Sequence, residues 1–143
     1  NAPLSAEHQL SDSNRSQQHT SVDLGEEEFT VGRPHPMIDN DLRIRRLLQE
    51  ARDPEVAVIL LDVVIGYGAH PDPAAELGQA VQKARAQAKE AGRDLIVVAS
   101  VTGTEQDPQC LSRQAQTLEA AGVVVCSSNA QAARLVASIV EVD

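Results

Sequence analysis

Apolar residues along this chain gather in continuous runs, which are separated by longer segments with helical periodicity. The runs at residues 56–65, 94–101 and 123–126 do not alternate with polar residues, which is typical of parallel strands buried on both faces. The run at 56–65 in particular should be buried on both faces. We therefore expect it to form the central strand of a sheet.

Four segments with apolar residues at helical spacing lie around these runs, and residues that favour helix starts precede them. We expect these helices to begin near Asp39 or Asp41, at Asp72-Pro73, at Asp107-Pro108 and at Ser128. Aspartate and serine accept hydrogen bonds from the first backbone N–H groups of a helix, and proline fits its first turn.

The alternation of strands and helices predicts an α/β fold. We expect an open parallel sheet of about four strands with helices on both faces and a flavodoxin-like strand order. The fourth strand would be the weaker apolar run at residues 20–24, next to the run at 56–65. Residues 1–19 are polar and aperiodic, which predicts a disordered tail or interdomain linker before a domain at residues 20–143.

Composition excludes several classes of partner. With 12 Lys and Arg against 21 Asp and Glu, the net charge is −9, so neither nucleic acid nor an anionic membrane is expected to bind. No apolar stretch approaches the roughly 20 residues of a membrane span. Cys110 and Cys126 do not have a zinc-binding spacing, so we expect no metal, and reduced thiols in a cytoplasmic protein.

The candidate chemistry lies in the loops that follow the first two apolar runs. Both loops would lie at the carboxyl edge of a parallel sheet and next to a helix start, where ligands bind in open α/β sheets. The first loop contains Gly66, Tyr67 and Gly68, whose glycines would let a ligand approach the backbone. In the second, Thr102, Gly103 and Thr104 would donate hydrogen bonds to an anion, or would simply form a turn.

His70 is the candidate catalytic residue, because it ends the first loop at the head of a strand. In a functional role it would contact a phosphate or carboxylate, or carry protons near neutral pH. In a structural role it would only shape the turn before Pro71.

A proline-rich loop supplies two further candidates. His35 stands between Pro34 and Pro36, which stiffen the backbone, and Arg33 precedes them. Arg33 would hold an oxyanion through paired hydrogen bonds, with His35 beside it. The alternative is that this loop docks onto a partner domain.

These loops carry a resemblance to a known family. The strings GRPHPMID at residues 32–39, LLDVVIGYGAHPDP at 60–73 and VASVTGTE at 98–105 closely resemble those of FdrA proteins. The resemblance runs from about His19 to the end of the chain. FdrA proteins are similar to the alpha subunit of succinyl-CoA synthetase, and this stretch is similar to the second, ligase-like domain of that subunit.

The resemblance implies a fragment of an acyl-CoA-synthetase-like protein, or of a carbamoyltransferase that acts on oxamate in allantoin degradation. The substrate would then be a small acyl phosphate or carbamoyl phosphate. CoA and nucleotide would bind on other domains, and an N-terminal CoA-binding-like domain of the same protein and other subunits would be the partners. The domain would form one wall of an interdomain site and would be inactive alone.

The chain departs from that family pattern at one position that matters for mechanism. Succinyl-CoA synthetase is phosphorylated on a histidine in the loop after the strand that corresponds to residues 95–101. Here residues 102–107 read TGTEQD and contain no histidine. The alternative interpretation is therefore a non-catalytic scaffold that docks partner subunits.

Overall fold

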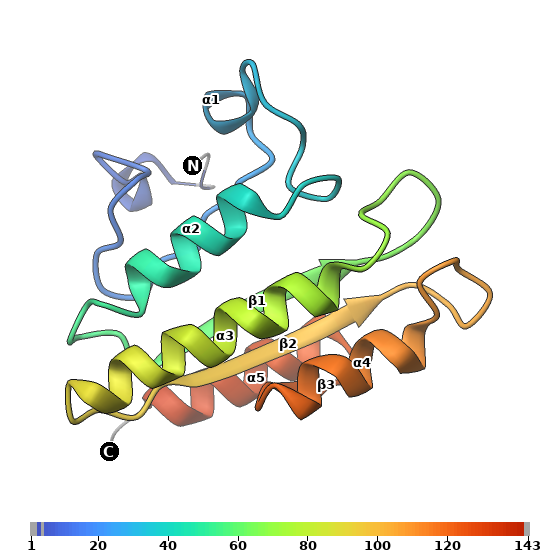
Figure 1. The fold of residues 1–143 in the computed structure, drawn as a ribbon. Helices are drawn as coiled ribbons and strands as arrows, with labels where there is room; N and C mark the ends of the chain where they lie inside the picture. Colours follow the sequence, from blue (N-terminus) through green and yellow to red (C-terminus); the bar gives the residue numbers. More distant parts are fainter. Residues whose placement is uncertain (1–2, 4, 142–143) are drawn as a thin grey trace.

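The computed structural model describes residue 3 and residues 5–141 of the chain, drawn in Figure 1. In chain order the elements are the 3-10 helix η1 (Ala6–His8), α1 (Glu27–Thr30), α2 (Asp41–Glu50), β1 (Val58–Val64), α3 (Pro73–Glu90), β2 (Ile96–Thr102), α4 (Leu111–Ala120), β3 (Val124–Cys126) and α5 (Asn129–Val140). From α2 onwards helices and strands alternate, as the periodicity predicts.

The sheet is parallel, open and, within the described residues, three-stranded in the order β1-β2-β3. Val58 pairs with Ile96 and Val64 with Thr102, so β1 and β2 are in register over their whole length. The α/β fold with an open parallel sheet is confirmed. The fourth strand at residues 20–24 is wrong, because this segment belongs to no strand and is separated from β1 by a groove.

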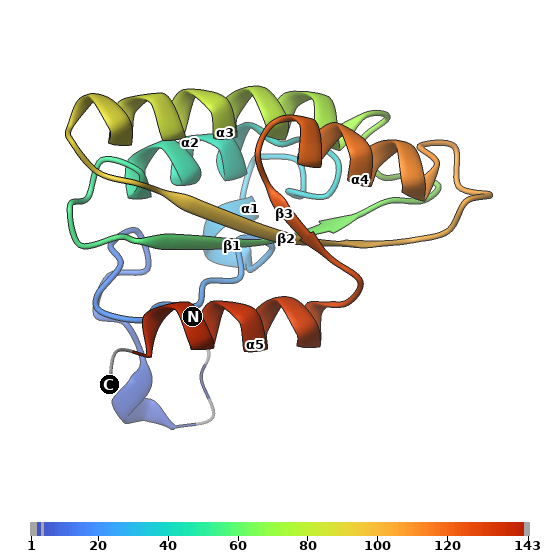
Figure 2. The ribbon, with the colours of Figure 1, turned by 90° about the horizontal axis from the view of Figure 1, so that it is seen from below.

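Helices cover the two faces of the sheet unequally (Figure 2). On one face α2, α3 and α4 pack over the larger core, in which Leu47, Leu77 and Leu118 are fully buried. On the other face α5 covers a smaller cluster around Val98 and Ala132. Side chains toward the β1 edge of that second face are less well covered, and Leu60 is 38% exposed.

The central strand is β2 and not β1. Residues 97–100 of β2 are all buried, whereas β1 forms one edge of the sheet and has only Val63 fully buried. The expectation that the run at 56–65 is central was therefore wrong for this structure. A continuous apolar run shows that a strand is suited to burial, but it does not show which neighbours are present.

The predicted helix starts are correct for α3 and wrong for α4. Asp72 is the N-cap residue of α3, and Pro73 is its first residue. After Asp107-Pro108, however, the chain makes turns, and α4 begins only at Leu111. The reason is that the Asp107 carboxylate accepts hydrogen bonds from the backbone N–H and the hydroxyl of Thr104, which closes the loop.

The segment before residue 20 contacts α2. The Arg46 guanidinium donates to the Ser13 carbonyl and to the Ser16 hydroxyl, and the Gln49 amide donates to the Asn14 carbonyl. The domain boundary between residues 19 and 20 stays a prediction. In the part of the chain that the structure describes, no helix has the length and apolar character that a membrane crossing requires.

Candidate functional site

The two candidate loops lie side by side at the carboxyl edge of the sheet. The last register pair joins Val64 to Thr102, and the Ile65 N–H donates to the Thr102 carbonyl at 2.9 Å. Both loops project from the same end of the sheet in Figures 1 and 2. Gly66, Tyr67 and Gly68 therefore share one edge with Thr102, Gly103 and Thr104.

Gln109 fastens the first loop to the second. Its Oε1 accepts the Gly66 N–H at 3.1 Å, while its Nε2 donates to the carbonyls of Gly66 at 2.9 Å and His70 at 3.0 Å. The residue is 2% exposed. A single buried amide thus fixes both ends of the loop at residues 66–70.

Gln114 performs a related function one turn into α4. Its Oε1 accepts the Ala74 N–H at 2.9 Å, and its Nε2 donates to Asp72 Oδ1 at 2.9 Å. The side chain is fully buried. It therefore supplies the N-terminal turn of α3 with the hydrogen-bond acceptor that the Asp72 side chain does not provide.

Neither glutamine could be recognised from the sequence as part of the site. A glutamine in a polar segment carries no sequence pattern that predicts a side chain joining two loops by hydrogen bonds. One signal was present for Gln114, which lies three residues after Leu111 and four before Leu118. A polar residue on the apolar stripe of a helix is expected to be buried with hydrogen-bond partners.

Both ring nitrogens of His70 are engaged within the protein. Nδ1 accepts the Asp72 N–H at 3.1 Å, and Nε2 lies 3.4 Å from Glu76 Oε2, which also accepts a hydrogen bond from Asn40 Nδ2. Only 16% of the His70 side chain is exposed. To act as an acid or base, His70 would have to release the Glu76 carboxylate so that Nε2 could contact a substrate.

Carboxylates of the second loop accept hydrogen bonds from the N–H and O–H groups that an anion would otherwise use. Thr104 gives both its N–H and its hydroxyl to Asp107, and Glu105 accepts hydrogen bonds from the N–H and hydroxyl of Ser112. Hydrogen bonds from Cys110 and Ser112 hold the pKa of the Glu105 carboxyl below its ordinary value, although this group is exposed. A phosphate at the start of α4 would have to displace these side chains.

The proline-rich loop reaches the first loop through its backbone. The His70 N–H donates to the Met37 carbonyl at 2.8 Å, and His35 Nδ1 accepts the Met37 N–H at 3.1 Å. Arg33 is exposed, and among the described residues no hydrogen bond joins its side chain to the other candidates. Tyr67 is 88% exposed and Ile38 51% exposed, so the rim of this edge carries uncovered apolar side chains.

We expect Gln109→Leu to loosen the first loop without unfolding the domain. The variant removes three hydrogen bonds and leaves the Gly66 N–H without its acceptor, which costs about 1–2 kcal/mol. Amide exchange at Gly66 should become about tenfold faster, because tenfold corresponds to about 1.4 kcal/mol. Gln106→Leu, at an exposed position of the same connection, should leave that rate unchanged. An unchanged rate in Gln109→Leu would contradict the connecting role of Gln109.

Comparison with known proteins gives the family. The CoA-ligase family matches residues 4–139 of this chain. The uncharacterized protein YahF of Escherichia coli strain K12 is 50% identical to it over 123 residues, which are 86% of this chain and 24% of YahF. The chain thus spans about a quarter of the length of this relative. With a family match over nearly the whole chain, on an open parallel α/β sheet, this protein belongs to the CoA-ligase family, and its domain is similar to those of succinyl-CoA synthetase.

Proposed function

We propose that this domain forms one wall of an interdomain site for a small acyl phosphate or carbamoyl phosphate in a larger CoA-ligase protein. The observation that carries the proposal is the fastening of two glycine loops at one sheet edge through Gln109. The ligand would lie over residues 66–68 and 102–104. An N-terminal CoA-binding-like domain of the same protein would supply the opposite wall, with CoA and nucleotide bound there.

The first loop is the better suited of the two to meet a ligand. Gly66 and Gly68 have φ of +144° and +82°, a backbone conformation in which residues with a side chain would be strained. A Cβ on Gly68 would meet no atom within 4 Å, which indicates open space around it. The exposed ring of Tyr67 lies between these glycines and would contact the opposite domain or the ligand.

His70 would serve as a proton carrier or phosphate contact at the base of this loop. Its ring is held in one orientation by the Asp72 N–H on Nδ1. In this arrangement Nε2 is the nitrogen that would turn from Glu76 to substrate. Arg33 and His35 would contribute from the proline-rich loop once a second domain covers the edge. One wall alone cannot orient two reactants, so the isolated domain should show no turnover.

Activity of the full-length protein tests this proposal. We expect turnover with carbamoyl phosphate and oxamate, or with succinate, CoA and ATP, and a loss of at least tenfold in kcat/KM in His70→Asn. His8→Asn, at an exposed position in η1, is the matched control and should keep the wild-type rate. Wild-type turnover in His70→Asn would remove His70 from the mechanism, and no turnover with either substrate set would contradict the proposal.

A docking scaffold is the second candidate, and one observation favours it. The donors in the second loop and at the start of α4 are already bound to Asp107 and Glu105, which is an arrangement that needs no ligand. Met37, Ile38 and Tyr67 surround the same edge as exposed apolar side chains. For a scaffold, Tyr67→Ala in the full-length protein would weaken subunit assembly, measured by ultracentrifugation. For a catalytic wall, it would change KM or kcat in an assembled protein.

A further inference from the structure

The sequence of β1 and its position in the sheet disagree. Its apolar residues run without alternation, as in strands with neighbours on both sides, yet β1 forms an edge and Leu60 is 38% exposed. An edge strand of seven residues, six of them apolar, can pair with other chains and aggregate, and proteins usually protect such edges. This disagreement indicates that something covers the edge in the complete protein.

The backbone geometry identifies the groups that face outward. The Ala57 carbonyl accepts from Ile96, and the Ile65 N–H donates to Thr102, so the odd-numbered residues direct their N–H and C=O groups to β2. Backbone groups alternate along a strand. The even-numbered residues, which are Val58, Leu60, Asp62 and Val64, therefore direct theirs away from the sheet.

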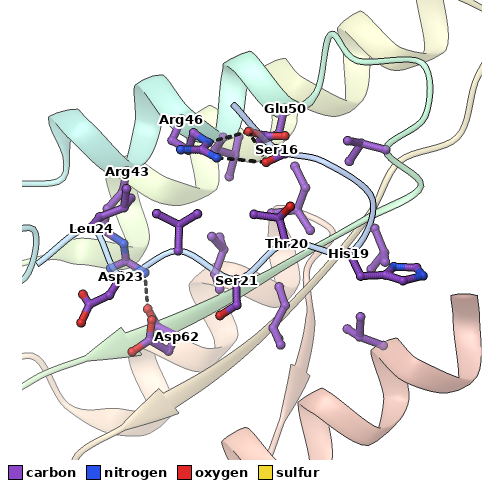
Figure 3. Close-up of a pocket in the computed structure, with 18 of the residues that line it drawn as sticks. Ser16, His19, Thr20, Ser21, Asp23, Leu24, Arg43, Arg46, Glu50 and Asp62 are labelled. Carbon is purple, nitrogen blue, oxygen red and sulfur yellow. Dashed lines mark hydrogen bonds and ion pairs between the residues drawn. The ribbon is translucent and has the colours of Figure 1, made fainter. Parts of the chain in front are cut away.

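These four residues line a groove with a volume of about 820 Å³, shown in Figure 3. Its opposite wall is the segment at residues 20–24, which runs along β1 in the same direction. Arg43 and Leu47 of α2 line it from one helix layer, and Val136 and Val140 of α5 line it from the other. The groove therefore lies in the plane of the sheet, between the two helix layers, where a further strand would lie.

Arginine side chains bind two of the outward carbonyls along this edge. The Arg93 guanidinium donates to the Val56 carbonyl at 3.2 Å, and the Arg43 guanidinium donates to the Asp62 carbonyl. Burial lowers the pKa of Arg43, and the Asp62 carboxylate opposes this effect. Between these two carbonyls the outward groups of β1 span about five residues, a common length for a strand.

We propose that a strand of the same polypeptide, from outside these 143 residues, inserts into this groove and pairs in parallel with β1. The chain spans 24% of the length of YahF, so a relative of this kind has ample further chain to supply it. The strand would be uncharged and rich in Val, Ile and Leu, because Leu47, Val136 and Val140 line the groove. The charged α2 residues that also line it are already bonded, Arg46 to Glu50 and Arg43 to the Asp62 carbonyl. It would also contact the segment at residues 20–24 and turn β1 into an interior strand. This inference does not depend on the proposed function.

Amide hydrogen exchange at single-residue resolution in the full-length protein tests the insertion. We expect the N–H groups of Val58, Leu60, Asp62 and Val64 to exchange at least 100-fold more slowly than unpaired amides, at a rate independent of protein concentration. Ile59 and Val63, which face β2, serve as internal references for the folded sheet. Rapid exchange at the four outward amides would overturn the proposal, and protection that vanishes on dilution would overturn it in favour of a second copy of the chain.

A pair of variants then separates strand insertion from general stability. Leu60→Lys places a charge where the inserted strand and its connections would pack, so outward-amide exchange in the full-length protein should accelerate at least tenfold while Ile59 and Val63 stay protected. Val124→Lys is the matched control, because Val124 is 47% exposed and lies at the opposite edge, on the same sheet face as Leu60. It should leave the outward amides slow. If Leu60→Lys also leaves them slow, the strand does not occupy the groove beside Leu60, and the proposal fails.

Discussion

Replacing Gly103 by alanine should lower the free energy of unfolding by about 4 kcal/mol, since two independent costs add. Gly103 has φ of +157°, a backbone conformation that L side chains rarely adopt, at a cost of about 1–3 kcal/mol. The added Cβ would also overlap Ile65 Cγ1, and would lie 2.8 Å from its Cδ1 and 3.0 Å from Asp107 Oδ2. Ile65 is 5% exposed and belongs to the larger core, so moving its side chain would disturb the packing of its neighbours. Overpacking of this kind costs about 1–3 kcal/mol.

Gly68→Ala separates the two costs. Gly68 also has a positive φ, +82°, but an added Cβ would meet no atom within 4 Å. This variant should therefore lose only the conformational part, about 1–2 kcal/mol. Because the chain has no Trp, urea unfolding is best followed by far-UV circular dichroism. If both variants lose the same free energy of unfolding, the Ile65 side chain moves away from the new methyl group at little cost.

The elements of this fold could be predicted because each depends on local pattern. Continuous apolar runs gave β2 and β3, and the Asp72-Pro73 pair placed the start of α3 at the correct residue. The start of α4 could not be predicted, because Asp107 has two possible uses. Its carboxylate can cap a helix or close a loop, and the choice depends on the position of Thr104 in three dimensions.

The place of β1 in the sheet could not be predicted for a different reason. An apolar pattern shows that a strand is suited to burial, whereas its place in the sheet depends on which other segments pair with it. The segment at residues 20–24 shows the same limit. It lies along β1 and lines the same groove, but it has no strand partner among the described residues.

At the candidate site, the sequence could predict where the loops meet but not what holds them together. Parallel strands bring their following loops to one edge, so the proximity of Gly66 and Gly103 follows from topology alone. The contacts of Gln109 and Gln114 cross about 40 positions of the chain and depend on side-chain rotamers. The same applies to His70, whose contact with Glu76 arises from the fold of the loop back onto α3.

Gln114→Leu should have the second largest effect, a loss of about 3 kcal/mol in the free energy of unfolding. Leucine fills a similar space, so the packing around this position should persist, and the loss should come from hydrogen bonds. The buried Ala74 N–H would have no acceptor, at a cost of about 1–3 kcal/mol, and the Asp72 carboxylate would lose a donor.

The matched control for this variant is Gln116→Leu, the same substitution two residues further along α4. Gln116 is exposed, so the change should alter the free energy of unfolding by less than about 0.5 kcal/mol. Both can be measured by urea unfolding. The loss in Gln114→Leu should also appear as faster exchange of the Ala74 amide, since that N–H is the one left without a partner. A stable Gln114→Leu with slow exchange at Ala74 would mean that Asp72 rotates to cap α3 itself, and Asp72→Ala in the Gln114→Leu background would then be strongly destabilising.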